Sequence, residues 1–179
     1  MMMMVIRHLL SIAALQLVVA VLVPRWLATT NNIPLKLGTT VAGILAQGAG
    51  LLLLALGLFL FASSLGRFAT EGEGTLAPWD PPRRLVVRGP YRYVRNPMIS
   101  GVLFVLLGEA LILLSQPHLI WALIFLGMNV VVIPLVEEPG LRRRFGASYI
   151  EYSRHVPRLI PRLRPWEPQT PASGMDSAQ

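Results

Sequence analysis

The stretch LGTTVAGILAQGAGLLLLALGLFLFASSL, residues 37–65, contains no charged side chain in 29 positions. A helix needs about 20 apolar residues to cross the hydrocarbon core of a bilayer. Backbone groups in lipid must be hydrogen-bonded within their own segment, which favours a helix. We therefore expect a membrane-spanning helix over about residues 40–64. Its glycines, and the small residues Ala46 and Gly50 four positions apart, suit close packing against another helix.

The composition extends this expectation to the rest of the chain. The 179 residues are 54% hydrophobic and 14% charged, whereas a soluble domain carries about 25% charged residues. Three further apolar segments lie at residues 9–27, 98–115 and 118–136. The expected fold is all-α, a polytopic membrane helix bundle of about four transmembrane helices. The last two helices would form a tight hairpin.

The two ends of the chain are less regular. Pro24 and Arg25 are expected to close the first apolar segment, for which a signal peptide is the alternative interpretation. Residues 1–164 are expected to form one membrane domain. The tail at residues 165–179, rich in proline, serine and polar residues, is expected to be disordered.

The charge distribution predicts the topology and excludes several functions. Thirteen of the 15 arginines fall into two regions, one between the second and third apolar segments and one after the fourth. These are Arg67, Arg83, Arg84, Arg88, Arg92 and Arg95, and Arg142, Arg143, Arg144, Arg154, Arg158, Arg162 and Arg164. This is the positive-inside pattern, so both regions and both termini are expected in the cytoplasm. The same placement argues against a nucleic-acid partner. The absence of cysteine excludes thiolate catalysis, and His8, His118 and His155 lack metal-ligand spacing.

The first motif, GPYRYVRNP at residues 89–97, precedes the third apolar segment. Gly89-Pro90 predicts a turn, and Asn96-Pro97 predicts an N-cap followed by the first helical residue. One interpretation is a basic and aromatic collar at the membrane surface. The other is an anion site, because a helix N-terminus would face a loop dense in arginine.

The second motif, EEPGLRRRFGASYIEY at residues 137–152, follows the fourth apolar segment. Its adjacent carboxylates are expected to find cationic partners or a cationic ligand. Pro139 is expected to break the helix, with an amphipathic surface helix restarting there. Leu141, Phe145, Tyr149 and Tyr152 would share one face of that helix. At least some of Arg142, Arg143 and Arg144 would face phospholipids, which does not exclude a site nearby. Glu109 lies inside the third segment, where either a packing hydrogen bond or a substrate-cavity role is open.

Together these two motifs resemble the integral-membrane methyltransferases related to isoprenylcysteine carboxyl methyltransferase and the phospholipid N-methyltransferases. The resemblance rests on GPYRYVRNPMISG, residues 89–101, and EEPGLRRRFGASYIEYSRHVPRLIP, residues 137–161. It implies methyl transfer from S-adenosyl-L-methionine, bound in a cytoplasmic pocket, to a lipophilic acceptor that enters from the membrane. The cofactor-binding residues that it implies are Tyr91, Val94, Arg95, Asn96, Pro97, Gly101, Glu137 and Glu138, and an aromatic contact from Tyr149 is also expected. Loss of Arg95 or Glu138, the predicted catalytic residues, is expected to harm function most.

Two positions depart from the family pattern. Asn96 stands where many relatives have histidine, and Ile99 where many have tyrosine; an asparagine amide cannot titrate near neutral pH. An isoprenylcysteine-type carboxylate is the first acceptor that the resemblance implies, with a phospholipid amine or a small thiol as alternatives. The alternative of another class is a non-catalytic lipid-binding or assembly protein. The expected partners are therefore a lipophilic small molecule and membrane lipids, and the sequence does not indicate an oligomeric state.

Overall fold

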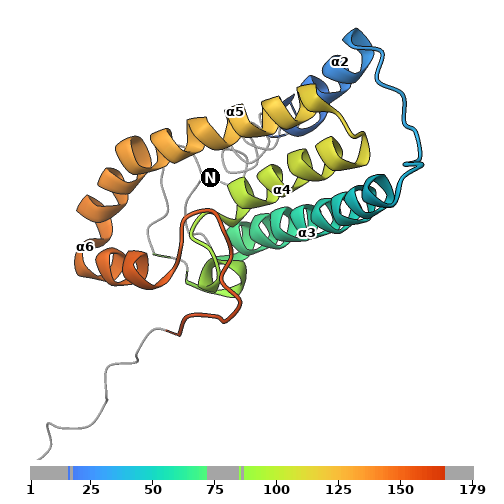
Figure 1. Cartoon of the computed structure of the whole chain (residues 1–179). Coiled ribbons are helices and arrows are strands. Elements are labelled where there is room, and N and C mark those ends of the chain that lie inside the picture. The colour runs from blue at the N-terminus through green and yellow to red at the C-terminus, as the bar shows by residue number, and fades with distance from the viewer. Residues whose placement is uncertain (1–15, 17, 72–84, 86, 168–179) are drawn as a thin grey trace, which may run out of the picture.

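The computed structural model describes residues 16, 18–71, 85 and 87–167, and all regular secondary structure in these residues is helical. Figure 1 shows how the helices are arranged, with α4 lying between α3 and α5. In chain order the elements are the π-helix η1 (Val18–Leu22), α2 (Val23–Thr30), α3 (Val41–Glu71), the 3-10 helix η2 (Gly89–Arg92), α4 (Pro97–Ile112), α5 (Gln116–Val132), the π-helix η3 (Ile133–Glu137) and α6 (Glu138–His155).

The contact between α3 and α4 is made through two pairs of glycines. A Cβ atom added at Gly57 would lie 2.6 Å from the carbonyl oxygen of Gly101, and one added at Gly50 would lie 2.8 Å from that of Gly108. Both distances are below any normal contact, so only glycine allows the two backbones to lie this close. The predicted close packing is confirmed for Gly50 and Gly57, whereas a Cβ at Gly48 would meet no described atom within 4 Å.

Neutral hydrogen bonds tie the segments together at the end of the bundle that holds the α4–α5 hairpin. The Gln47 side chain donates from Nε2 to the carbonyl oxygens of Lys36 (2.6 Å) and Ile112 (2.8 Å). The buried His118 ring joins Ser115 Oγ (2.7 Å) to the Pro24 carbonyl oxygen (3.1 Å). These bonds connect α2, α3 and the hairpin.

Two helical stretches, Val41–Arg67 and Gln116–His155, are long and apolar enough to cross a membrane. In the most apolar 18 residues of each stretch, only 17% and 11% are buried in the protein. Their leucines, isoleucines and valines therefore face outward, as lipid contact requires. The other two expected spans correspond to shorter apolar helices, Val18–Thr30 and Pro97–Ile112. The four-span topology therefore stays a prediction, and the residues before Gln16 lie outside the described part of the chain.

Two helices extend beyond the expected membrane spans, and the expected break at Pro139 was wrong. The first helical segment continues through Pro24 and Arg25 to Thr30, and α3 runs beyond residue 64 to Glu71. Pro139 does not break the chain of helices, because it stands in the first turn of α6, directly after the π-helical turn of η3. Wide π-turns accommodate backbone carbonyls that a proline leaves without an N–H partner.

The break lies instead at Gly146, whose φ of 52° and ψ of −129° interrupt α6. Positive φ of this kind favours glycine, because a Cβ would clash with the backbone. The kink directs the second half of α6 back toward the start of α4, as Figure 1 shows. This return brings the two sequence motifs to the same end of the bundle.

Candidate functional site

An extended segment after α6, residues 156–167, runs back along the loop that precedes α4. We call this segment the strap. The backbone N–H of Arg95 donates to the Pro157 carbonyl oxygen (2.8 Å), and that of Asn96 donates to the Arg158 carbonyl oxygen (3.1 Å). Farther along, the Arg162 N–H donates to the Tyr93 carbonyl oxygen (3.0 Å). The strap thus holds the first motif in place over most of its length.

Side chains reinforce both ends of the strap. Ser100, on the first turn of α4, donates from Oγ to the Leu159 carbonyl oxygen (2.6 Å). Trp166 packs against Tyr152 (ring centroids 5.7 Å apart) and stacks on His155 (5.4 Å). Trp166 belongs to the tail that was expected to be disordered, so the packed structure extends past residue 164; residues 168–179 lie outside the described residues.

The centre of the site is the carboxylate of Glu138, a residue that is only 2% exposed. Arg158 binds it with both Nε and Nη2, the latter 3.1 Å from Oε2. Arg95 Nη1 donates to Oε1 at 3.0 Å, and Arg142 Nη2 reaches Oε2 at 3.5 Å. In the described part of the chain, one carboxylate therefore meets three guanidinium groups, and the local charge is positive.

Arg95 retains a hydrogen-bonding group that this network does not use. Its Nη1 also donates to the Tyr149 hydroxyl (3.1 Å), but its buried Nε has no hydrogen-bond partner among the described residues. A buried donor without a partner costs about 1–3 kcal/mol. The arrangement is therefore suited to an added acceptor group, such as a carboxylate, beside Arg95.

The surroundings fix the charge states of the site. The hydrogen bond from Arg158, with the charges of Arg95 and Arg142, lowers the pKa of the Glu138 carboxyl group although burial opposes this. Glu138 is thus ionised at neutral pH. Burial raises the pKa of the Tyr91 hydroxyl to about 12 and also raises that of Tyr149. Both tyrosines are therefore neutral hydrogen-bonding groups.

The structure brings the predicted catalytic pair together, since Arg95 and Glu138 stand 43 positions apart in the chain and form an ion pair. Tyr149 joins them through its hydroxyl group. Glu137, by contrast, is exposed and makes no hydrogen bond or ion pair with the described arginines of this network, although the Glu138 charge helps to raise its pKa. The predicted pair of carboxylates is thus divided into one buried residue and one exposed residue.

The remaining predicted residues lie at the start of α4 and in the loop before it. Tyr91 accepts a hydrogen bond at its carbonyl oxygen from the Tyr152 hydroxyl (2.7 Å), and Val94 is fully buried. Gly101 faces Gly57 in the α3–α4 contact, so close helix packing is sufficient reason for a glycine at this position. Its contact with a cofactor stays a prediction, as do the cofactor contacts of the other residues.

Asn96 and Pro97 occupy the predicted N-cap and first position of α4. The Asn96 side chain, however, caps none of the described N–H groups of this helix. Its amide donates instead toward the Arg158 carbonyl oxygen at 3.4 Å. Asn96 therefore holds the strap, and its side chain does not cap the helix.

Sequence reasoning missed the part played by Arg158 and by Ser100. Arg158 was interpreted only as one of the positive charges that set the topology. Its position in the second motif, beside Pro157, could have indicated a place in the site. Arg142 belongs to the three arginines of which at least some were expected to face phospholipids, and it also contacts Glu138 from the next helical turn. Glu109 does not join this site, because it lies 14 residues beyond Arg95, near the opposite end of α4.

The described residues thus form a helical protein with two stretches apolar enough to cross a membrane and an arginine-rich cluster around Glu138 at one end of the helices. Residues 45–148, more than half of the chain, match the phospholipid methyltransferase family. The chain belongs to this family, which confirms the resemblance expected from the two motifs.

A curated relative adds a second comparison. Methanethiol S-methyltransferase 2 of Bradyrhizobium diazoefficiens is 38% identical to this chain over 73 residues, which are 41% of the chain and 27% of that protein. The matching part of the chain thus spans about a quarter of the relative's length. No solved structure matches the chain.

Proposed function

We propose that this protein transfers a methyl group from S-adenosyl-L-methionine to a small lipophilic acceptor at a membrane. The observation that carries the proposal is the buried Arg95–Glu138 pair with the unpartnered Nε of Arg95 beside it. Family membership supplies the reaction type. The site supplies a place for a zwitterionic, hydrogen-bonding ligand.

The residues present fit such a cofactor. Its carboxylate would accept from Arg95 Nε and from Arg158, whose side chain is 43% exposed and therefore within reach of a ligand. When bound, S-adenosyl-L-methionine supplies a methyl group on a positively charged sulfur, and transfer to a thiol leaves a methyl thioether, S-adenosylhomocysteine and a proton. Its ammonium group and ribose hydroxyls would find carboxylate oxygens at the exposed Glu137.

The contacts support a different role for Glu138 from that expected. Both of its oxygens already accept from arginines, so a direct bond to an ammonium group would compete with them. We assign Glu138 to positioning: it holds Arg95 and Arg158 at fixed places and offsets part of their charge. Asn96, which cannot act as a base near neutral pH, positions the strap, and the chain's task is to align the reactants and exclude water.

As the methyl acceptor, we prefer a small thiol to the isoprenylcysteine-type carboxylate that was expected from the sequence. The reason is the relative whose name states methanethiol S-methylation. A phospholipid amine and an isoprenylcysteine carboxylate remain alternatives within the same family. The low burial of the two apolar helical stretches and the arginines at one end support a multi-pass arrangement with the site and both termini in the cytoplasm.

The test is equilibrium binding of S-adenosyl-L-methionine to detergent-purified protein, followed by transfer of a labelled methyl group to methanethiol or to a lipid extract. We expect saturable binding and a labelled thioether. Absence of saturable cofactor binding would overturn the proposal and favour the rival function, a non-catalytic lipid-binding or assembly protein. Label in the lipid fraction alone would replace the thiol by a phospholipid acceptor.

A further inference from the structure

We propose that the strap is a membrane anchor, in which Ile160 and Leu163 enter the acyl-chain region of the adjacent membrane leaflet and Arg164 contacts the head groups of anionic phospholipids. The strap carries apolar residues on two faces. Val156 and Leu159 face the protein and are 1% and 7% exposed, whereas Ile160 and Leu163 are 75% and 99% exposed. Exposed apolar residues are common on protein surfaces, so the position of these two relative to the apolar helices decides their role.

The contact between α3 and α4 gives the depth at which the strap begins. The glycine pairs make the two helices antiparallel neighbours, in which Ser100 stands level with Leu58. The Ser100 hydroxyl donates to the Leu159 carbonyl oxygen (2.6 Å), so Leu159 and Ile160 lie at this level. Leu58 precedes Arg67, the first charged residue of α3, by nine residues, which is about 14 Å along the helix. Ile160 therefore lies at the depth of the apolar part of α3.

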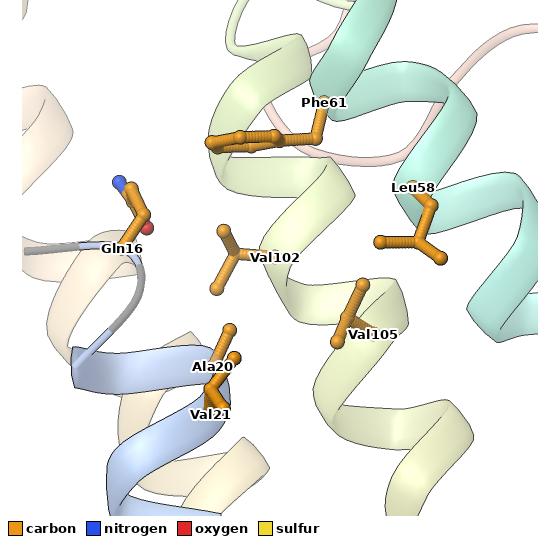
Figure 2. A pocket seen from close by; sticks show the side chains of 7 residues that line it. All are labelled: Gln16, Ala20, Val21, Leu58, Phe61, Val102 and Val105. Atoms are coloured by element: carbon orange, nitrogen blue, oxygen red, sulfur yellow. The ribbon is translucent and has the colours of Figure 1, made fainter. Parts of the chain in front are cut away.

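The surroundings at this depth are apolar. Figure 2 shows Leu58 and Phe61 of α3 near Val102 of α4, and these three side chains line one apolar groove. Phe59 of α3 is 67% exposed, and no residue between positions 37 and 65 is charged. A side chain that leaves the protein surface at this depth therefore meets lipid, because an apolar helix of this length places the same level inside a bilayer. Ile160 is such a side chain.

Farther along, the strap reaches the level of the first charge of α3. The Arg162 N–H donates to the Tyr93 carbonyl oxygen (3.0 Å), directly after η2. This 3-10 helix lies beside Arg67, since a Cβ added at Gly89 would be 3.0 Å from Arg67 Nε. Arg164 is exposed and forms no ion pair within the described chain. Apolar residues toward the membrane interior and a basic residue at its edge are the arrangement of an interfacial anchor.

The charge of this surface selects the lipid. Residues 138–167 contain seven arginines and three glutamates, without lysine or aspartate. Arg143, Arg144 and Arg154 are exposed, and within the described chain they form no ion pairs. An anionic leaflet attracts such a basic surface, whereas a leaflet of neutral phosphatidylcholine does not. Anionic phospholipid is therefore the partner that fits both the apolar and the basic residues of this end.

The depth of the strap can be measured directly, because the chain has no cysteine. Ile160→Cys and Leu163→Cys are labelled with bimane and reconstituted in vesicles of phosphatidylcholine and phosphatidylglycerol with brominated acyl chains. Leu51→Cys, at a 59% exposed position of α3, is the control for lipid contact. Glu151→Cys, at an exposed position of α6, is the control for contact with water.

We expect brominated lipid to quench the labels at residues 160 and 163 several-fold more than the label at residue 151, and nearly as much as the label at residue 51. Iodide in the aqueous phase should show the reverse order. Labels at residues 160 and 163 that behave like the label at residue 151 would overturn the proposal, whatever the protein binds or methylates.

The same labels test the charge of the lipid. Replacing phosphatidylglycerol by phosphatidylcholine should lower the quenching at residue 163 roughly twofold or more, as should Arg164→Gln in anionic vesicles. Arg25→Gln, at an exposed position of α2, is the matched control and should change nothing. Equal quenching in neutral and anionic vesicles would overturn anionic phospholipid as the partner.

The strap also carries Arg158, so its insertion in the membrane should support cofactor binding; this consequence rests on the proposed function. In vesicles, Leu163→Asp should lower the affinity for S-adenosylhomocysteine several-fold, whereas Leu37→Asp, at an 88% exposed position near the hairpin end, should not. Equal affinities of the two variants would overturn this coupling. Absence of S-adenosylhomocysteine binding to the wild type would overturn the proposed function, while the quenching would still decide whether the strap is an anchor.

Discussion

The two ends of the bundle are both joined by polar groups, but the groups differ in kind. At the hairpin end, Gln47 and His118 make neutral hydrogen bonds to backbone carbonyl oxygens and to Ser115. At the strap end, Glu138 holds guanidinium groups, and Arg95 keeps a buried donor without a partner in the described chain. At the hairpin end, Gln47 and His118 find their partners within the protein, although the buried Oε2 of Glu109 has none among the described residues. The strap end differs because it combines an unpartnered donor with excess positive charge, which suits an anionic ligand.

Loss of the Glu138 carboxylate is expected to have the largest effect. Glu138→Ala leaves the buried Arg95 without its ion-pair partner, and breaking a buried pair in this way costs about 3–5 kcal/mol. We expect a fall of that size in the free energy of unfolding in detergent, together with loss of S-adenosylhomocysteine binding. Glu151→Ala, at an exposed position on α6, is the control. Equal stability of the two variants would contradict the central place of Glu138.

The glycine contacts lie between the two ends and should be next in effect. Gly101→Ala puts a Cβ 2.8 Å from the Gly57 carbonyl oxygen and 2.9 Å from the Phe61 nitrogen. Backbone atoms cannot give way as a side chain can, so we expect a loss of about 1–3 kcal/mol in thermal or chemical unfolding. Gly127→Ala meets no described atom within 4 Å and should be neutral or slightly stabilising. The prediction fails if both substitutions behave alike.

A change at the hairpin end should separate stability from binding. Gln47→Leu removes donors to two carbonyl oxygens, and we expect a loss of about 1–2 kcal/mol. Ser63→Ala, which removes a hydrogen bond within α3 alone, should cost less. Neither variant should change S-adenosylhomocysteine affinity measured on folded protein. An affinity loss in Gln47→Leu would show that the two ends are coupled.

The smallest effect is expected from pH in the neutral range. The pKa of Glu138 is lowered in the folded protein, so its contribution to stability is present above the unfolded pKa of about 4.3 and is lost as pH falls through the folded pKa. The difference in unfolding free energy between wild type and Glu138→Gln should stay constant near neutral pH. It should change only in the acid range, where Glu138 and the neighbouring Glu137, whose pKa the Glu138 charge helps to raise, take up protons. A difference that changed between pH 8 and pH 6 would point to another titrating group.

Part of this arrangement follows from local sequence signals. Runs of uncharged residues predicted the helices, and Asn96-Pro97 predicted the start of α4. The spacing of Leu141, Phe145, Tyr149 and Tyr152 predicted a shared face, and these residues do pack in one cluster with Val156. Such signals work because helical periodicity and N-terminal positions depend on residues near in sequence.

Other features depend on contacts that no local pattern specifies. Pro139 is a poor guide to the helix end, because the π-turn of η3 precedes it and Gly146 supplies the break. The role of Arg158 depends on the strap, whose hydrogen bonds to residues 92–100 join segments more than 50 positions apart. Trp166 is ordered by Tyr152 and His155, although its neighbours in sequence are typical of a disordered tail.

The central claim is that the strap end, and not the hairpin end, binds the cofactor through Arg95. The most direct test is isothermal titration calorimetry, with S-adenosylhomocysteine titrated into detergent-purified wild type, Arg95→Gln and Gln47→Leu. We predict saturable binding to the wild type and to Gln47→Leu, and a loss of roughly tenfold or more in affinity for Arg95→Gln, as expected for a charge-assisted hydrogen bond. Wild-type affinity in a folded Arg95→Gln variant would contradict the account.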